Sequence, residues 1–437
     1  AMNPPPTSAN PTPAGPGCNA SGTVGGPDPG REARNILRLE AYQVVVRVGW
    51  IFKTETIIMP AVLDAVVDSG LLRGFLPVLN RAGQSLPPLA FAGVLGRRPV
   101  KKWTLVRTSL AMAACFAVLA VAWQPLQAVR PDLLAVLFLL VYATFSVANG
   151  LNQLVAAALR GKLIPPGQRG RAMVVSVTIG SILAIVAAVA LLGPWLAAAD
   201  GFPRIFAATA GFFGLAAAIP ALLDEPADRP AAAAGPRPGL AGWREAVAAD
   251  PALVRLAVVA AMFSAVLMLF PHYQAFARDD LGCPRGSLLT WVVVQNAATA
   301  CASLVAGPVA DRRGTRLVLA WLVGGAALTP VLVTALSYLP PAVAAGWFWL
   351  VYAPLGLNPI ALTMFTNYAL ELAPRPGEHA RYVSLVGAAL AAPFAISPLV
   401  GWGIDVVGFR PVFLVGALVI AAGGAVAWGL PEPRQRG

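Results

Sequence analysis

Ionisable side chains stand inside two long apolar stretches near the start of the chain. Arg47, Lys53 and Glu55 belong to the first stretch, and Arg81 lies in the second, close to the amide of Gln84. An ionisable group in the middle of an apolar layer costs about 2.5–3.5 kcal/mol, so each of them needs a partner or a task. Several cations around one carboxylate are suited to binding an anion and exchanging a proton. Alternatively, the charges pair with one another and only fix the packing of two helices.

Helical geometry predicts which of these charges meet. On a helix that advances by about 100° per residue, Lys53 and Glu55 lie about 160° apart and face opposite ways. If the two stretches are antiparallel helices joined by a short turn, Glu55 and Arg81 lie at the same depth. We therefore predict an ion pair between Glu55 and Arg81, which would leave Arg47 and Lys53 as excess positive charge for a substrate anion.

The second half of the chain holds fewer polar candidates. His272 follows Pro271 near the end of an apolar stretch, and Gln295 and Asn296 stand together in the next one. His272 could take part in binding or ion coupling, or it could be a hydrated histidine at the membrane surface. The four cysteines have no paired or metal-like spacing, and no Cys/His/Ser cluster has catalytic spacing. We therefore expect no metal site, no cofactor and no enzymatic activity.

The elements that position these groups must be membrane-spanning helices. The chain of 437 residues is 57% hydrophobic and only 12% charged, which is incompatible with a soluble globule of this size. A net charge of +12 would suggest nucleic acid as the partner of a soluble protein. In a membrane protein the same excess is expected of cytoplasmic loops. The expected partner is therefore the lipid bilayer and not a nucleic acid.

Windows of about twenty apolar residues, long enough to cross a hydrocarbon core of roughly 30 Å, recur along the chain. They predict twelve spans, at 42–67, 72–95, 103–123, 133–159, 173–197, 205–223, 253–276, 288–310, 317–338, 342–370, 382–404 and 412–430. The predicted organisation of this all-α membrane protein is a disordered cytoplasmic tail (1–38), a six-helix bundle (39–223), a cytoplasmic linker (224–250), a second six-helix bundle (251–430) and a cytoplasmic tail (431–437).

Basic residues predict the orientation of these spans. Most of the 32 Lys and Arg residues fall in the two tails and in every second loop. Those expected on the other side are Arg73, Arg130, Arg204, Arg278, Arg285 and Arg410. Because cytoplasmic loops carry the excess of basic residues, we expect both termini in the cytoplasm and the chain in the plasma membrane, the inner membrane of a bacterium.

One loop carries a specific pattern. Gly307, Asp311, Arg312, Gly314 and Arg316 form G-x-x-x-D-R-x-G-x-R between the eighth and ninth spans. This pattern resembles the signature loop of the major facilitator superfamily of secondary transporters. The resemblance implies two pseudo-symmetric six-helix halves, so a second copy of the loop is expected about two hundred residues away.

A weaker copy of the loop is present in the first half. Gly93, Arg97 and Arg98 occupy corresponding positions, but Arg97 stands where the pattern has aspartate. In the stronger loop, we expect Asp311 to meet the amino terminus of a later helix near Arg381 and to hold the cytoplasmic side shut. These residues therefore form the predicted gating motif.

The resemblance implies a secondary active transporter that moves a small organic solute by alternating access. Asn149, Asn152 and Asn358 fall on the fourth and tenth spans, which line the central cavity in the family. These amides could bind solute, or they could only bond neighbouring helices at about 0.6 kcal/mol each. We expect a monomer, which could be proton-coupled, anion-specific or an exporter. The alternative is a receptor or assembly protein that keeps the fold without transport.

Two native cysteines report on the expected orientation. Cys283 follows the seventh span on the outer side, and Cys18 lies in the inner tail. In intact cells a membrane-impermeant thiol reagent is expected to label Cys283 and to miss Cys18. Labelling of Cys18 without Cys283 would reverse the orientation.

Overall fold

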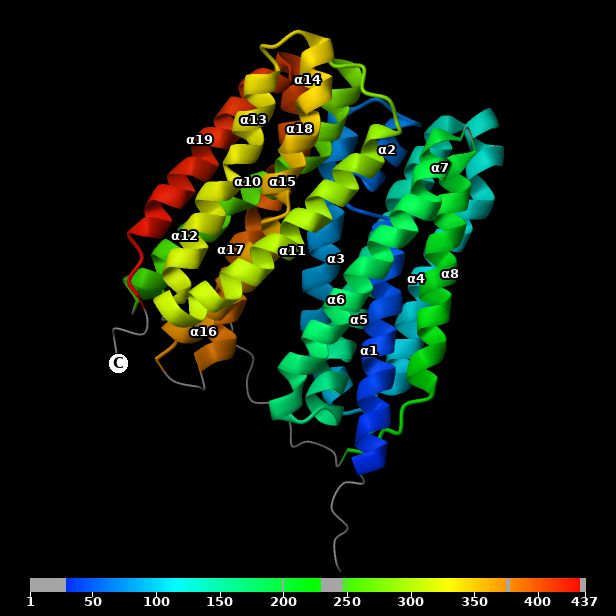
Figure 1. The fold of residues 1–437 in the computed structure, drawn as a ribbon, viewed down its shortest axis with the longest axis vertical. Coiled ribbons are helices and arrows are strands. Elements are labelled where there is room, and N and C mark those ends of the chain that lie inside the picture. Colours follow the sequence, from blue (N-terminus) through cyan, green and yellow to red (C-terminus); the bar gives the residue numbers. More distant parts are fainter. Residues whose placement is uncertain (1–28, 199, 229–246, 249, 375–377, 433–437) are drawn as a thin grey trace, which may run out of the picture.

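The computed structural model describes residues 29–198, 200–228, 247–248, 250–374 and 378–432. The regular structure in these ranges is helical, and Figure 1 shows the helices as two bundles that stand side by side. Helices α1 to α8 form the N-half, and helices α10 to α19 form the C-half. We call the end of the molecule at which α1 begins and α19 ends the terminal side, and the opposite end the loop side (Figure 1).

The N-half consists of helices that cross the bundle from one side to the other, some of them interrupted. They are α1 (Pro29–Ile51), α2 (Ile58–Asp64), α3 (Gly70–Gly96), α4 (Lys102–Val129), α5 (Pro131–Leu163), α6 (Pro166–Ala187), the π-helical turn η1 (Ala188–Leu192), α7 (Gly193–Ala197) and α8 (Gly201–Ala221). The π turn directly precedes Gly193 and Pro194, where kinks are expected because proline cannot donate a backbone hydrogen bond.

The C-half repeats this arrangement with more interruptions. Its helices are α10 (Pro251–Asp279), α11 (Ser287–Arg313), α12 (Thr315–Ala326), α13 (Leu328–Leu336), α14 (Pro341–Trp347), the 3₁₀ turn η2 (Phe348–Val351), α15 (Tyr352–Leu355), α16 (Asn358–Leu372), α17 (His379–Ala391), the 3₁₀ turn η4 (Ala392–Ile396), α18 (Ser397–Val407) and α19 (Phe409–Trp428).

Within the described residues, ten helical stretches are long and apolar enough to cross a membrane. The two other predicted spans correspond to α1 with α2 and to α3. Both carry charged side chains in their interiors, which lowers their mean hydropathy. The predicted all-α architecture of twelve helices in two bundles is confirmed.

The first span differs from its prediction in being broken. It was expected to be continuous over 42–67, but α1 ends at Ile51 and α2 begins only at Ile58. In the break, the Thr54 carbonyl accepts hydrogen bonds from the N–H groups of Ile57, Ile58 and Met59 and so starts the second helix. A buried lysine and two threonines disfavour an uninterrupted apolar helix here.

The chain also becomes helical earlier than predicted. Residues 29–38 were assigned to a disordered tail, yet α1 begins at Pro29. The reason is tertiary, because Asn35 exchanges hydrogen bonds with the backbone of Asp224 at 3.0 and 2.9 Å. Arg38 also forms an ion pair with the Asp224 carboxylate at 3.2 Å. Residues 1–28 and 229–246, which hold most of the predicted tail and linker, lie outside the described residues.

A carboxylate from the segment after α8 holds the terminal side of the N-half together. The fully buried Glu225 side chain accepts hydrogen bonds from the backbone N–H groups of Lys101 and Lys102, at the start of α4, at 2.7–2.9 Å. It also pairs with Lys162 at 2.7 Å, at the end of α5. Because the first N–H groups of a helix have no partner within the helix, Glu225 acts as a tertiary cap that ties three helices together.

In the C-half, a carboxylate lies at the corresponding place. Glu432 follows α19 as Glu225 follows α8, and its carboxylate lies against Gly314, where α12 begins. Gly314 has φ +94°, a conformation that favours glycine, and a side chain there would overlap the carboxylate. The signature-loop glycine is therefore needed both for the turn and for the approach of Glu432.

Removing the Glu225 carboxylate is expected to destabilise the N-half. Glu225→Ala leaves the Lys101 and Lys102 N–H groups without their acceptor and leaves Asp228, 2.9 Å away, as the ion-pair partner of Lys162, which we expect to cost about 2–4 kcal/mol of unfolding free energy. Chemical denaturation in mixed micelles measures the change. Asp200→Asn is the matched control, because the ion pair of Asp200 within the described residues is with exposed Arg204 and its loss should cost at most about 0.5 kcal/mol. Equal effects of the two substitutions would contradict the role of Glu225.

Candidate functional site

A cavity of about 660 Å³ lies between the two halves. It is bordered by α1 with the break at 52–57, by α5 and α6 of the N-half, and by α11 and α16 of the C-half. The polar residues that line it are Gln43, Arg47, Thr54, Glu55, Thr56, Asn149, Asn152, Gln153, Arg160, Ser176, Gln295, Asn296 and Thr299. Of the predicted site residues, the cavity wall therefore contains Arg47, Glu55, Asn149 and Asn152, whereas Lys53, Arg81, Gln84, His272 and Asn358 are not among its lining residues.

The pairing predicted for Glu55 is wrong. Glu55 Oε1 lies 2.7 Å from Lys53 Nζ, although a continuous helix would turn these side chains away from each other. The wheel argument fails because α1 has already ended at Ile51. The Lys53 ammonium is fully buried, 3.5 Å from the ring centroid of Trp50 and 4.2 Å from that of Phe145. Lys53 is thus neutralised by one carboxylate and two aromatic faces, and it is not excess charge.

Arg81 forms no ion pair within the part of the chain that the structure describes. Its guanidinium carbon lies 5.5 Å from the centroid of the Phe394 ring, and the charge of Glu55 still acts on it through space. Gln84 is occupied by its own helix, since Nε2 donates to Asn80 Oδ1 at 2.9 Å. The second predicted span therefore contributes to packing around the cavity rather than to its wall.

Two arginines of the cavity wall lack an ion-pair partner among the described residues, Arg47 on α1 and Arg160 on α5. Their depths follow from Tyr42, whose hydroxyl donates to Asn152 Oδ1 at 2.7 Å and so sets α1 and α5 in register. Arg160 lies toward the terminal side of this level and Arg47 toward the loop side, about 20 Å apart at 1.5 Å per residue. One cation therefore stands toward the mouth of the cavity and the other deep inside it.

The amides of the cavity differ in how far they are already bonded. Asn152 accepts from Tyr42 and donates to Thr108 and Ser109 at 3.1 and 2.9 Å, so its side chain joins helices. In contrast, Nδ2 of Asn149 and both polar atoms of Asn358 are buried with no hydrogen-bond partner in the described structure. Asn149 can therefore offer a hydrogen bond to a bound molecule, because a buried amide without a partner is costly.

His272 is not a hydrated surface histidine. Its side chain is completely buried on the loop-side half of α10, and neither ring nitrogen has a hydrogen-bond partner within the described residues. It packs against Gly401 of α18, where a β-carbon would come within 3.2 Å of the imidazole. His272 therefore lies beside the contact between α10, α3 and α18, away from the cavity wall.

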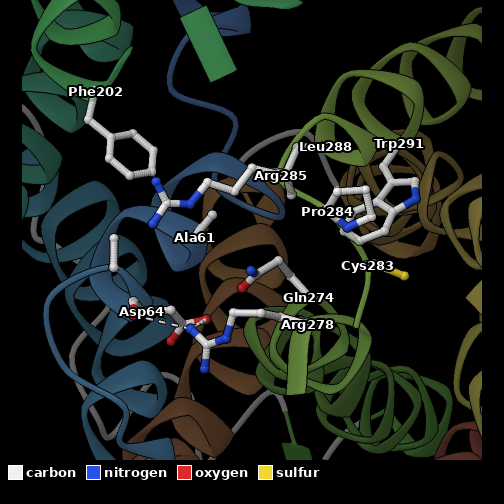
Figure 2. Close-up of a pocket in the computed structure, with 11 residues that line it drawn as sticks. Ala61, Asp64, Phe202, Gln274, Arg278, Cys283, Pro284, Arg285, Leu288 and Trp291 are labelled. Carbon is white, nitrogen blue, oxygen red and sulfur yellow. Dashed lines mark hydrogen bonds and ion pairs between the residues drawn. The ribbon is translucent and has the colours of Figure 1, made fainter. Parts of the chain in front are cut away.

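The loop side is closed by charges that the sequence analysis did not assign to the site. Arg73 of α3 pairs with Asp64 and Asp68 within the N-half. Arg278 of α10 reaches across from the C-half to the same two carboxylates, at 3.4 and 3.0 Å. Figure 2 shows Arg278 directed at Asp64. The pocket that these two residues line has a volume of about 50 Å³. The sequence signal that could have predicted this cluster is a charged residue at the loop-side end of three spans, namely Asp64, Arg73 and Arg278.

The predicted gating motif lies at the terminal side, where the structure describes only part of it. The side chain of Asp311 lies outside the described residues, so the contact expected between Asp311 and Arg381 stays a prediction. Arg381 donates to Glu378 at 3.3 Å. In the same region Arg316 lies 3.9 Å from Glu432, Arg98 donates to Thr104 at 3.0 Å, and the side chains of Arg97 and Arg312 are exposed.

The Lys53–Glu55 pair can be tested by a double-mutant cycle. Lys53→Met and Glu55→Gln each leave the remaining partner without its counter-charge. The loss of unfolding free energy in the double mutant is therefore expected to be about 1–3 kcal/mol smaller than the sum of the losses in the two single mutants. Denaturation in micelles measures the three values. The cycle of Glu55→Gln with Arg81→Gln is the control and is expected to be additive within about 0.5 kcal/mol. Stronger coupling to Arg81 than to Lys53 would overturn the pairing described here.

Comparison with known proteins places the chain in a family. No curated protein matches it. Among solved structures, a mutant of the nucleoside transporter NupG shares 12% identity at a TM-score of 0.71 and covers 90% of this chain and 99% of its own. A bacterial Spinster homologue, inward-facing and occupied, shares 14% identity at a TM-score of 0.67, with 93% of this chain and 97% of the homologue covered. A D-xylose–proton symporter shares 15% identity at a TM-score of 0.65, with 90% of this chain and 98% of the symporter covered. The Major Facilitator Superfamily pattern matches residues 85–375, more than half of the chain, and the protein belongs to this superfamily.

Proposed function

We propose that this protein is a proton-coupled secondary transporter of a small organic anion and that the structure is its inward-open state. The observation that carries the proposal is a polar cavity between two pseudo-symmetric halves, with ion pairs joining the halves on the loop side. Such a site, closed on one side, is what alternating access requires. The terminal side is then the cytoplasmic side of the plasma membrane, and the working unit is a monomer.

The charge of the cavity supports an anionic solute. Glu55 is already neutralised by Lys53, whereas Arg47 and Arg160 have no ion-pair partner among the described residues. A cation held at mid-depth without a counter-ion is expensive, and a bound carboxylate or phosphate would supply that counter-ion. The neighbouring amides and hydroxyls, such as Asn149 and Thr54, add hydrogen bonds that suit a hydroxylated or amino-bearing organic acid rather than an apolar drug.

Glu55 is the group proposed to carry the proton. It is 18% exposed, lines the cavity and holds the Lys53 ammonium from a non-helical segment. When Glu55 takes up a proton, the ammonium loses its counter-charge and the cavity becomes more positive by one charge. Because protonation of Glu55 makes the cavity more positive, it favours binding of an anion at Arg47, and a bound anion in turn favours protonation, which is the coupling that a proton-driven carrier needs.

The substrate class can be tested by ligand-induced stabilisation of the purified protein. Organic acids, amino acids, sugars and cationic drugs are screened by thermal shift, where a ligand at a hundredfold its dissociation constant stabilises by about 2.7 kcal/mol. We expect stabilisation by organic acids. Arg47→Gln is expected to weaken that binding by about ten- to a hundredfold, because a hydrogen bond between charged groups is lost.

Two control variants separate binding from general charge. Arg160→Gln, toward the mouth of the cavity, should slow uptake at low salt but change the dissociation constant little at physiological salt. Arg204→Gln, in an exposed pair with Asp200, should change neither. The proposal fails if only neutral or cationic solutes bind. It also fails if none of the anions that bind is transported into proteoliposomes in a counterflow assay.

A further inference from the structure

Asp405 of the C-half caps a helix of the N-half. Its Oδ1 accepts a hydrogen bond from the Gly70 N–H at 2.8 Å, and its Oδ2 accepts one from the Leu71 N–H at 3.2 Å. These are the first N–H groups of α3, a helix of 27 residues, and the side chain of its own N-cap, Ser69, reaches only Leu72. The first N–H groups of a helix have no acceptor within the helix and carry its positive dipole end. A carboxylate from the opposite half supplies both the acceptor and the counter-charge.

Glycines on both halves make this contact possible. A β-carbon on Gly70 would overlap the Gly401 carbonyl and the Asp405 carboxylate. A β-carbon on Gly74, one turn further along α3, would lie 2.7 Å from the backbone of Pro398. Small residues spaced by four let helices in a membrane approach to backbone contact. Helices α3 and α18 therefore meet so closely that no larger side chain fits between them.

We infer that Asp405 and the Gly70–Gly401 contact form a latch that favours the state closed on the loop side. The inference rests on the proposed function, because only a molecule whose loop side opens needs such a latch. When the halves separate on the loop side, α3 moves away from α18. The Asp405 carboxylate and the N–H groups of Gly70 and Leu71 then bond to water instead of to each other. An interaction present in only one of two states shifts the equilibrium toward that state.

The latch is distinct from the arginine cluster described above. Asp64, Asp68, Arg73 and Arg278 join α2 and α3 to α10, whereas Asp405 joins α3 to α18. Asp405 is itself exposed at the loop side, so its effect on the equilibrium should be modest. A charge at an exposed helix terminus corresponds to about a two- to fivefold change in an equilibrium constant.

The equilibrium is measured by the rates at which two introduced cysteines, one buried at the loop side and one in the cavity wall, react with a water-soluble maleimide. Each reporter is introduced singly into a chain whose four native cysteines are replaced. Gln274→Cys reports from the loop-side contact and Val177→Cys from the cavity. When opening is faster than labelling, each rate is proportional to the population in which that side is open. The experiment needs no solute.

Asp405→Asn is expected to raise the labelling rate at position 274 by two- to fivefold and to lower the labelling rate at position 177. Asp405→Ala is expected to change both labelling rates in the same directions and by larger factors. Gly70→Ala should abolish the slow, protected reaction at position 274, because the closed contact cannot form. Asp132→Asn is the matched control, since Asp132 lies exposed in the first turn of α5 at the loop side, within its own half, and should change neither rate.

Rates that do not change in Asp405→Ala and Gly70→Ala would overturn the latch. Rates that rise together at both positions would do the same, because they would mean general loosening of the fold. The outcomes also separate the two proposals. Opposite shifts without any transported solute would leave the latch standing and remove the proposed function, whereas transport with unchanged rates would remove only the latch.

Discussion

The structure depends on the cost of placing charge inside an apolar bundle. Lys53 meets that cost within the protein, because Glu55 and the faces of Trp50 and Phe145 surround its ammonium. Arg47, six residues earlier on α1, has no such counter-ion among the described residues and faces the cavity instead. Two neighbouring cations on one broken span thus have different surroundings, because Lys53 is buried against its partners and Arg47 faces the cavity. This difference is the basis on which the cavity is proposed as a binding site.

The two sides of the molecule use their charges for different purposes. On the terminal side, Glu225 caps α4 of its own half and Glu432 lies against the start of α12 of its own half, so they stiffen the halves without joining them. On the loop side, Arg278 and Asp405 bond to groups of the other half. Rigid halves joined by separable contacts are the condition for movement as rigid bodies, because strain is then released at the interface and not within the bundles.

The helical spans and the two halves could be predicted from the sequence, because twenty-residue apolar windows and repeated loop glycines are local signals. The ionic contacts could not. The Glu55–Arg81 prediction assumed helical geometry through residue 55, but the helix ends at Ile51. Glu225 was unassigned because its partners, Lys101 and Lys162, are brought to it only by tertiary folding. His272 was judged by its position near the end of a span, while its burial depends on α18, which follows more than a hundred residues later.

The broken segment of the first span links the cavity to the closed side. Glu55 faces the cavity, and the next residue, Thr56, donates across the interface to Gln295 of α11 at 2.7 Å. A few residues further on, Asp64 takes part in the loop-side ion pairs. An anion at Arg47 or a proton on Glu55 would therefore act on a segment that itself joins the halves. Coupling between site and gate then needs no long chain of intermediates, because the non-helical segment at the cavity continues directly into α2, whose last residue is Asp64.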